Sequence, residues 1–495
     1  MFIHSAGSDD DRNVLQTPFI NLKFHPLGKL FALLAATLVL VSTPTRAGAN
    51  VTVTNAIARP SPDWLRDGVI YEIFPRDFSA TGNLNGVTAQ LDQLQSLGVT
   101  ILWIMPIHPI GEKGRKGIFG SPYSIMDYYA VDPAYGTLED FKRLVSEAHK
   151  RGMKVIMDLV ADHTAWDSVM MKHPEFYKHD RQGQVIPPVP DWTDVAALNY
   201  SDLQLRDYMF SMAKYWVQTC DVDGFRCDAA AMVPTDFWVQ LRAELTKIKP
   251  DIVLLAEASK PELLTNAFDI DYGWPLLATM DRVLIESAPA SEIKRTYEKS
   301  CAEFPKGALH LQISDDHDEA RAVARYGLNG ALAASALMFT LDGVPLIYNG
   351  METGDATESG GGALFTKLPI FWSPKGRPPL PEIYHNLIEL RHQYAAFRNL
   401  SVDWLHNSDE TSVVTFLRAD DKDQLLVVIN FSNRPLAGKL DMENINGFAP
   451  VKISGVYYSD ERPLPAFRLN GFEWRIYHRP ATLSNSVTRL SADKD

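Results

Sequence analysis

From residue 67 to about residue 394, short apolar runs alternate with stretches in which apolar residues recur every three or four positions. The first pattern is typical of buried strands and the second of helices. We expect helices at residues 87–97, 138–150, 203–218, 234–247, 331–341 and 380–394. About eight strand–helix units follow one another, which favours a closed parallel barrel with its helices outside. A doubly wound open sheet is the alternative, and the placement of the polar residues decides between the two.

Two changes of pattern divide the chain. An irregular stretch rich in His, Pro, Gly and Trp follows the third strand over residues 161–200 and predicts a small loop-like inserted domain. After residue 399, short strands separated by turns predict an antiparallel β-sandwich. We expect these strands at residues 402–405, 412–417, 424–431, 451–457 and 472–477. The expected organisation is an N-terminal extension with a signal peptide, the barrel, the insert, the β-domain and a tail, at residues 1–49, 50–398, 161–200, 399–482 and 483–495.

The first 49 residues indicate export rather than a folded element. Lys23 and Lys29 precede an apolar run at residues 30–41, and Ala47-Gly48-Ala49 follows as a small-residue cleavage site. The run is too short to span a membrane, so we expect no stable membrane insertion after cleavage. The sequence therefore predicts a secreted or periplasmic protein, with an uncleaved anchor as the alternative.

Composition narrows the partners. The net charge of −13 argues against a nucleic-acid partner. Aromatic residues make up 10% of the chain, which suits a protein that stacks on sugar rings. Trp166, Trp192 and Trp372 are candidates for such stacking, with local packing as the preferred interpretation. Three cysteines, Cys220, Cys227 and Cys301, allow at most one disulfide, so at least one thiol is free. The spacing of Cys and His indicates no zinc site, and nothing in the sequence indicates an oligomeric state.

Polar residues gather at four expected strand ends. Asp158, Asp162 and His163 follow the third strand, Arg226 and Asp228 the fourth, Glu257 the fifth, and Asp315, Asp316, His317 and Asp318 the seventh. A single acid at a strand end is as often a helix cap. Four such clusters on one rim of a barrel point instead to an active site, because barrel active sites are built at the carboxyl ends of the strands.

Glycosidic cleavage suits these residues. It needs an ionised carboxylate to attack the anomeric carbon and a protonated carboxyl to release the leaving oxygen. Alternation along a strand places Arg226 and Asp228 on one face, where the cation keeps the carboxylate ionised. Glu257 follows an apolar run, so burial is expected to hold its proton near neutral pH.

Four motifs resemble the α-amylase family of retaining glycoside hydrolases: DLVADH at 158–163, GFRCDAA at 224–230, LLAEAS at 254–259 and SDDHDEAR at 314–321. The resemblance extends through SPYSIMDYYAVDPAYGT at 121–137 and GVPLIYNGME at 343–352, and it covers about residues 64–480. It implies an enzyme that cleaves α-1,4-glucosidic bonds in starch-derived glucans or maltooligosaccharides with retention, through a covalent glycosyl-enzyme intermediate. Together with the expected signal peptide, this predicts a secreted enzyme.

The resemblance also implies roles for individual residues. Asp228 is the expected nucleophile, Glu257 the general acid/base and Asp318 the stabiliser of the transition state. Substrate-binding roles are expected for the side chains that surround them, Tyr123, His163, Arg226 and His317. The insert at 161–200 corresponds to the family's domain B.

The chain departs from the family at two kinds of position. Asp162 and Asp316 stand where members often carry Asn, and the first of these Asn residues is a frequent calcium ligand. We expect no cofactor for the chemistry itself, and the sequence leaves a structural calcium ion open because aspartate also ligates calcium. Ala231 and Met232 replace the common Lys-His pair, which allows oligosaccharide-acting activities.

Two alternative functions remain at the level of sequence. One is a transglycosylase or a sucrose- or trehalose-acting relative with the same fold. The other is a non-catalytic carbohydrate-binding relative, which the intact set of Asp228, Glu257 and Asp318 disfavours.

Overall fold

The computed structural model describes residues 56–372, 380–458 and 463–481. The expected signal segment, 1–49, and the C-terminal tail, 483–495, lie outside these ranges. A search of the described helices finds none long and apolar enough to cross a membrane.

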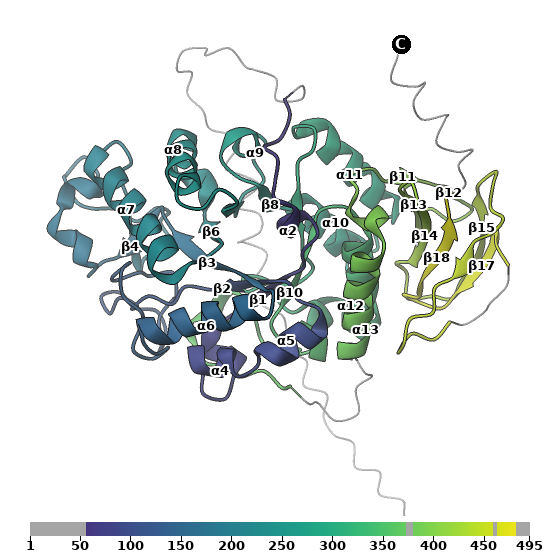
Figure 1. The fold of residues 1–495 in the computed structure, drawn as a ribbon, viewed down its shortest axis with the longest axis horizontal. Helices are drawn as coiled ribbons and strands as arrows, with labels where there is room; N and C mark the ends of the chain where they lie inside the picture. Colours follow the sequence, from purple (N-terminus) through teal and green to yellow (C-terminus); the bar gives the residue numbers. More distant parts are fainter. Residues whose placement is uncertain (1–55, 373–379, 459–462, 482–495) are drawn as a thin grey trace, which may run out of the picture. The chain divides into compact units, whose positions relative to one another are not determined.

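Eight parallel strands close into a barrel in the order β1-β10-β9-β8-β7-β6-β3-β2 (Figure 1). The strands are β1 Ile70–Ile73, β2 Ile101–Ile104, β3 Lys154–Val160, β6 Gly224–Asp228, β7 Val253–Ala256, β8 Ile270–Tyr272, β9 His310–Gln312 and β10 Val344–Tyr348. This closed order confirms the predicted barrel and excludes the open sheet. Because all eight strands run the same way, their carboxyl ends meet on one rim.

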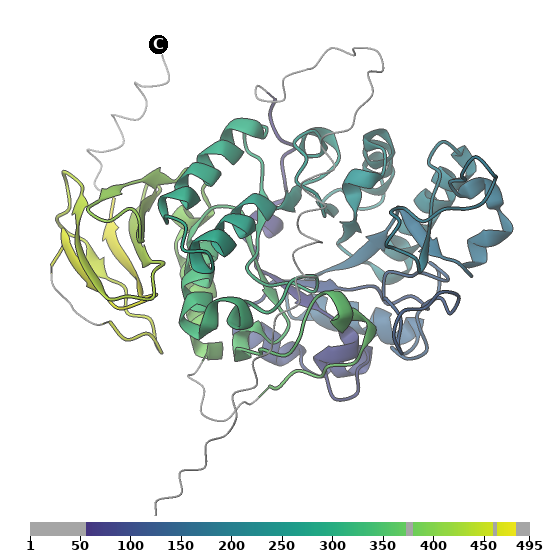
Figure 2. The ribbon, with the colours of Figure 1, turned by 180° about the vertical axis from the view of Figure 1, so that it is seen from behind.

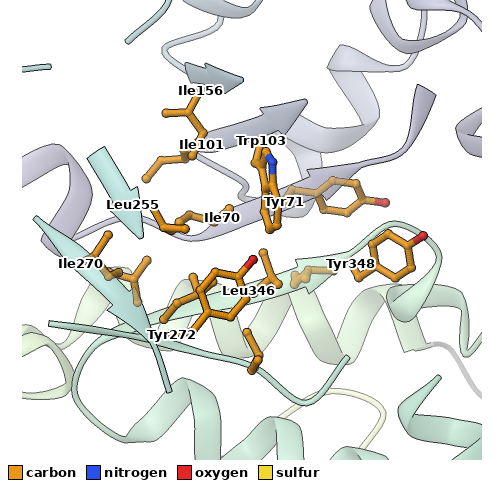
Figure 3. Close-up of a cluster of buried hydrophobic side chains, with 14 of the residues drawn as sticks. Ile70, Tyr71, Ile101, Trp103, Ile156, Leu255, Ile270, Tyr272, Leu346 and Tyr348 are labelled. Atoms are coloured by element: carbon orange, nitrogen blue, oxygen red, sulfur yellow. The ribbon is translucent and has the colours of Figure 1, made fainter. Parts of the chain in front are cut away.

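Large apolar side chains from the strands form the core of the barrel (Figure 3). Ile101, Ile156 and Leu255 come from three different strands and are almost completely buried. Burial of a side chain of this size contributes roughly 1.5–3 kcal/mol. Trp103 and Tyr272 meet edge to face with their ring centroids 6.5 Å apart. The strands are therefore apolar on consecutive residues, as expected for a parallel sheet covered on both faces.

Helices surround the barrel (Figures 1 and 2). The longer ones are α5 Leu91–Leu97, α6 Leu138–Lys150, α7 Leu203–Cys220, α8 Thr235–Thr246, α10 Trp274–Leu284, α11 Ser291–Glu303, α12 Ala322–Thr340 and α13 Leu380–Gln393. Short helices are α2 Asp63–Arg66, α3 Pro75–Phe78, α4 Leu84–Thr88 and α9 Leu263–Asn266. At the start of α6, Thr137 and Asp140 form a capping box, in which each side chain accepts from the other residue's backbone N–H.

The insert between β3 and α7 contains little regular structure. β4 His163–Ala165 and β5 Val195–Ala197 pair antiparallel and form its only sheet in the described chain. Two 3₁₀ turns, η2 Val169–Lys172 and η3 Pro174–Phe176, lie between them. The insert thus begins at the carboxyl end of a barrel strand and carries His163 at its first paired position.

After η7 Ala395–Arg398 the chain forms two antiparallel sheets, as predicted. The first has the order β11-β13-β14-β18-β16 and the second β12-β15-β17. Their strands are β11 Asp403–Trp404, β12 His406–Asn407, β13 Val413–Ala419, β14 Asp423–Asn430, β15 Leu436–Asp441, β16 Ala449–Pro450, β17 Ala466–Leu469 and β18 Trp474–Pro480. The strand expected at 451–457 is wrong, because these residues form turns after β16.

Candidate active site

Arg226 is the centre of the charged cluster on the barrel rim. It lies on β6 opposite Asp158 of β3, and its side chain is completely shielded from solvent. Its Nη1 donates to Asp228 Oδ1 at 2.7 Å and to Asp158 Oδ1 at 2.8 Å. The predicted pairing of Arg226 with Asp228 on one strand face is therefore present, and a neighbouring strand adds a second carboxylate.

Glu257 meets the same guanidinium from the end of β7. Arg226 Nη2 lies 3.0 Å from Glu257 Oε2. The backbone N–H of Ala229 donates to that same oxygen at 2.6 Å. Ala229 adopts φ 42°, in the left-handed region, so the turn after Asp228 points its N–H at the Glu257 carboxylate. Arg226 thus joins Asp228 and Glu257, whereas the sequence pattern paired it with Asp228 alone.

A second group of residues surrounds His317, in the loop after β9. His317 Nδ1 lies 2.5 Å from Glu72 Oε1, and its Nε2 lies 3.1 Å from Asp318 Oδ2 and 2.7 Å from the Tyr123 hydroxyl. The Tyr123 ring stacks on His317 with centroids 5.3 Å apart and 20° between the planes. Arg226 approaches the Tyr123 ring at 5.6 Å. Tyr123 therefore connects the His317 group to the Arg226 group.

His163 completes the set of predicted site residues. Its Nε2 lies 3.1 Å from the Tyr123 carbonyl oxygen, and its Nδ1 lies 2.9 Å from Asp162 Oδ1. The Trp192 ring packs against its edge at 5.6 Å between centroids. The Tyr128 hydroxyl donates to the His163 carbonyl at 2.7 Å, which fixes the backbone of the insert at this point.

The structure adds one residue that the sequence did not single out for the site, Glu72, and gives a role to Asp316. Glu72 lies within β1 and is completely buried, and it holds His317 from behind the rim. A charged residue inside the apolar run at 69–74 was the available signal. Asp316 Oδ1 accepts from the backbone N–H groups of Asp318 and Glu319 at 3.0 and 2.9 Å, so it sets the direction of the loop that carries Asp318.

Two tryptophans considered as sugar-stacking candidates have structural roles instead. Trp166 Nε1 donates to the Thr193 carbonyl inside the insert. Trp372 Nε1 donates to the Phe78 carbonyl, and its ring packs edge to face on Phe78. Trp192 alone among these candidates contacts a predicted site residue.

Burial and neighbouring charges set the proton affinities of the cluster. Burial and the Glu257 carboxylate raise the pKa of Asp228 well above its usual value, against the opposing effect of Arg226. Burial also raises the pKa of Glu257, again against Arg226. Burial alone would raise the pKa of Asp318, but the charge and hydrogen bond of His317 lower it. The site therefore keeps Asp318 ionised and favours one bound proton on the Asp228–Glu257 pair. The expectation that Arg226 alone keeps Asp228 ionised is not met, because burial and the Glu257 carboxylate outweigh the guanidinium. Asp228 is ionised as a nucleophile when the shared proton lies on Glu257.

Asp162, His163 and Asp228 form the one group of potential metal ligands in the described chain, with ligand atoms within 4.8 Å of one another. Burial lowers the pKa of His163, but the charge and hydrogen bond of Asp162 outweigh it and raise the pKa to about 9. Calcium takes about six to eight oxygen ligands, whereas this group offers two carboxylates and one imidazole nitrogen. The group therefore forms an imidazolium–carboxylate pair beside the expected nucleophile, and the structural calcium ion stays a prediction from the sequence.

Comparison with known proteins agrees with this geometry. The family model of the alpha-amylase catalytic domain matches residues 66–184 and 190–424. An alpha-amylase of Haloarcula japonica is 28% identical over 419 residues, which span 79% of this chain and 60% of that protein. A cyclomaltodextrinase of Geobacillus thermopakistaniensis is 27% identical over 75% of this chain and 70% of its own length. The chain thus spans less than two thirds of the Haloarcula relative.

Solved structures give the same result. A maltogenic alpha-amylase of Thermotoga neapolitana superposes with a TM-score of 0.76 at 29% identity, covering 84% of this chain and 100% of that one. An alpha-amylase of Lactobacillus plantarum gives a TM-score of 0.75 at 29% identity, covering 84% and 99%. The family model matches all eight barrel strands and the residues around Arg226 and His317. This chain therefore belongs to the α-amylase family of glycoside hydrolases.

Proposed function

We propose that this protein hydrolyses α-1,4-glucosidic bonds in maltooligosaccharides or cyclic maltodextrins with retention of configuration. The observation that carries the proposal is the shared contact of Asp228 and Glu257 with one guanidinium, at 2.7 and 3.0 Å. Two carboxylates on neighbouring nitrogens of one side chain are held close together, which suits the short carboxyl separation of retaining enzymes. Relatives named cyclomaltodextrinase and maltogenic amylase support short or cyclic glucans as substrates.

The mechanism uses the two acids in turn. Asp228 attacks the anomeric carbon and forms a glycosyl ester, while the bond from that carbon to the glycosidic oxygen breaks. Glu257 gives its proton to the departing oxygen. In the second step the Glu257 carboxylate takes a proton from water, whose oxygen attacks the anomeric carbon and releases Asp228. The raised pKa of Glu257 suits its role as the acid of the first step.

The surrounding residues suit the binding of one sugar at this point. Asp318 stays ionised beside His317, so its negative charge is available to a positively charged ring in the transition state. Tyr123 supplies an aromatic ring next to Arg226. His163 and His317 supply ring nitrogens for hydroxyl groups, each fixed in orientation by a buried carboxylate.

Replacement of the two acids tests the assignment. Asp228→Asn and Glu257→Gln are each expected to lower kcat for maltoheptaose by on the order of 10⁴-fold, while far-UV circular dichroism stays unchanged. An activated 5-fluoroglucosyl fluoride is expected to leave a covalent adduct on the peptide that contains Asp228, detected by mass spectrometry. Glu303→Gln, an exposed acid on α11, is the matched control. Near-normal turnover by either active-site variant contradicts the proposal.

Product analysis separates the alternatives. We expect maltose and glucose from β-cyclodextrin and maltoheptaose, with starch degraded more slowly. Products longer than maltoheptaose would instead indicate a transglycosylase. Met232, one of the two residues that replace the common Lys-His pair, is exposed and is compatible with this alternative. Binding without release of any reducing end would indicate a carbohydrate-binding protein.

We further propose that the protein is exported, on the basis of the basic, apolar and small-residue segments before residue 50. Two relatives from Bacillus subtilis are named intracellular maltogenic amylases, so the location needs its own test. Expression of the full chain in a bacterium is expected to give a mature protein in the periplasm or medium, with an N-terminus near residue 50. A protein that keeps residues 1–49 and stays in the cytoplasm contradicts export.

A further inference from the structure

A cavity with a volume of about 640 Å³ lies between the insert and α7. Its walls come from three segments: the loop of Asp127 and Tyr129, the turns η2 and η3, and the first turns of α7. Its lining shares no residue with the cluster around Arg226. The volume lies within the range of about 300–1,000 Å³ that is usual for small-molecule sites.

Aromatic rings form a connected wall of this cavity. Tyr129 and Tyr208 meet edge to face with centroids 5.6 Å apart, and Phe176 lies 6.4 Å from Tyr208. His173 stacks on Phe176 at 4.8 Å with 20° between the planes. Sugars present their C–H faces to aromatic rings, so such a wall suits a pyranose chain.

Polar groups without partners accompany these rings. Neither the Tyr129 nor the Tyr208 hydroxyl has a hydrogen-bond partner in the described chain, although burial raises the pKa of both and keeps them protonated donors. Gln204, Asp207 and Tyr208 project from consecutive turns of α7, at spacings that share one helix face. Asp207 forms no ion pair with any described residue.

The charges of the lining favour a neutral ligand. Two carboxylates, Asp127 and Asp207, stand against one ammonium group, Lys172. An anionic ligand needs an excess of cations, which this lining lacks. Carboxylates, phenols and an amide are the groups that bind sugar hydroxyls.

The cavity is also connected to the active site through the backbone. Tyr128 stands between Asp127 and Tyr129 in the chain, and its hydroxyl donates to the carbonyl of His163. One short loop therefore supports His163 on one side and the cavity on the other. A chain held in the cavity stays close to the insert that carries His163.

We propose that this cavity is a second binding site for neutral α-glucan chains, separate from the catalytic cluster, that retains long substrates on the enzyme. The identity of the sugar rests on the proposed function, whereas the site itself rests on the lining described above.

Variants on two walls test the site. Gln204→Ala with Asp207→Ala removes exposed polar groups from α7 and keeps its helix propensity. Tyr129→Phe with Tyr208→Phe keeps both rings and removes only the hydroxyls. Gln218→Ala, exposed on the same helix outside the cavity, is the matched control. Each is made in the Glu257→Gln background and run in native gels that contain soluble starch, so that binding is measured without turnover.

We expect both double variants to weaken starch retardation at least about fivefold, and the Gln218→Ala control to migrate like its parent. In the active background, kcat/KM for p-nitrophenyl-α-maltoside is expected to stay within about twofold, because so short a substrate does not reach both sites. Unchanged retardation in both variants, or a parent that starch does not retard, overturns the proposal. If the wild type still cleaves maltoheptaose in that case, only the second site fails. If the cavity variants weaken starch retardation but the wild type has no hydrolase activity, the second binding site is supported and the proposed function is wrong.

Discussion

Arg226 balances the charge of the active site, because its buried guanidinium meets three carboxylates. Asp158, Asp228 and Glu257 lie 2.7–3.0 Å from its Nη atoms. The Trp103 ring lies against the guanidinium, 5.2 Å from ring centroid to Cζ, and helps to shield it from water. The three carboxylates therefore depend on Arg226 rather than on water as their partner. A buried charge that loses its partner is costly, whereas the intact group is nearly neutral in its effect on stability.

Arg226→Met is therefore expected to lower the free energy of unfolding by about 3–5 kcal/mol at pH 7, as measured by urea denaturation. Arg226→Lys keeps the positive charge but lacks the planar fork, so we expect it to recover part of the stability and little of the activity. If the Met variant unfolds at the same urea concentration as the wild type, the three carboxylates do not depend on this cation.

The buried carboxyl group of Glu352, after β10, is expected to make the stability of the protein depend on pH. The Tyr71 hydroxyl donates to its Oε1 at 2.6 Å, and burial raises its pKa to about 7. Between about pH 4.5 and 7 the unfolded chain releases this proton while the folded chain keeps it, so stability falls as pH rises through this window. Glu352→Gln keeps an acceptor for Tyr71 and has no proton to lose.

We expect Glu352→Gln to gain about 3 kcal/mol relative to the wild type between pH 4 and pH 8, in urea denaturation at several pH values. The exposed Glu303→Gln serves as the control, with no such gain. Parallel curves for the wild type and Glu352→Gln would mean that Glu352 is already ionised in the folded protein.

The sequence predicted the residue pairs that depend on local geometry alone. Arg226 and Asp228 share a face because they are two positions apart in a strand, and no tertiary information is needed for this. All seven predicted site residues lie in the connected cluster. The contacts of Glu72 with His317 and of Glu257 with Arg226 join different strands, and such neighbours are fixed only by closure of the barrel.

Among the elements, the Gly-rich loop at residues 354–362 positions Asp318. Ser359 Oγ donates to the carbonyls of Glu319 and Asp316 at 2.7 and 3.2 Å. Gly360 has φ 74° and ψ 173°, and a Cβ at this position would lie 2.3 Å from the Asp318 carbonyl oxygen. Only glycine combines this backbone conformation with so close an approach.

Gly360→Ala is therefore expected to displace Asp318 and lower kcat for maltoheptaose about 10- to 100-fold, with a smaller change in KM. Gly362→Ala in the same loop is the control, because its Cβ meets nothing within 4 Å and its φ is not in the left-handed region. Equal kcat values for the two variants would remove this role of the loop.

The elements differ in how well the sequence predicted them. The bounds expected for α6 are those observed, because its periodic apolar face starts at a capping box and ends before Gly152. The predicted helix at 87–97 is instead two helices, α4 and α5, which Gln90 separates with φ −107° and ψ 8°. α10 and α11 were not predicted. α11 has one fully buried residue, Ile293, so it lacks the apolar stripe on which periodicity depends.

For the whole molecule, the barrel and the β-domain share one hydrophobic core. A single cluster of buried residues contains barrel residues such as Phe339 together with Phe416, Val427 and Trp474 of the first antiparallel sheet. A second, smaller cluster lies on the other side of that sheet. The composition change near residue 399 correctly marked a change of architecture, but it gave no sign that the core continues across it.

Two buried arginines connect the barrel to the β-domain around η7. Arg391 of α13 donates to the Phe397 carbonyl at 3.1 Å, and Arg418 of β13 donates to the carbonyls of Ala396 and Phe397 at 3.1 and 3.2 Å. Domains joined by small polar interfaces unfold separately, whereas a large apolar interface couples them. We therefore expect one calorimetric transition for the barrel and β-domain.

Arg418→Met tests this coupling, because it removes the Arg418 donor from the Ala396 carbonyl and leaves the Phe397 carbonyl with Arg391 alone, while filling a similar space. Its expected cost is about 2–4 kcal/mol, from the loss of several hydrogen bonds to a charged group. If the two parts unfold together, the whole transition shifts to lower temperature and activity on maltoheptaose disappears at the same temperature as the β-sheet signal. Lys439→Met, on the exposed side of β15, is the control and should leave the transition in place. Two transitions in the wild type, or a variant in which only an early transition moves while the barrel keeps its activity, would mean that the shared core does not couple them.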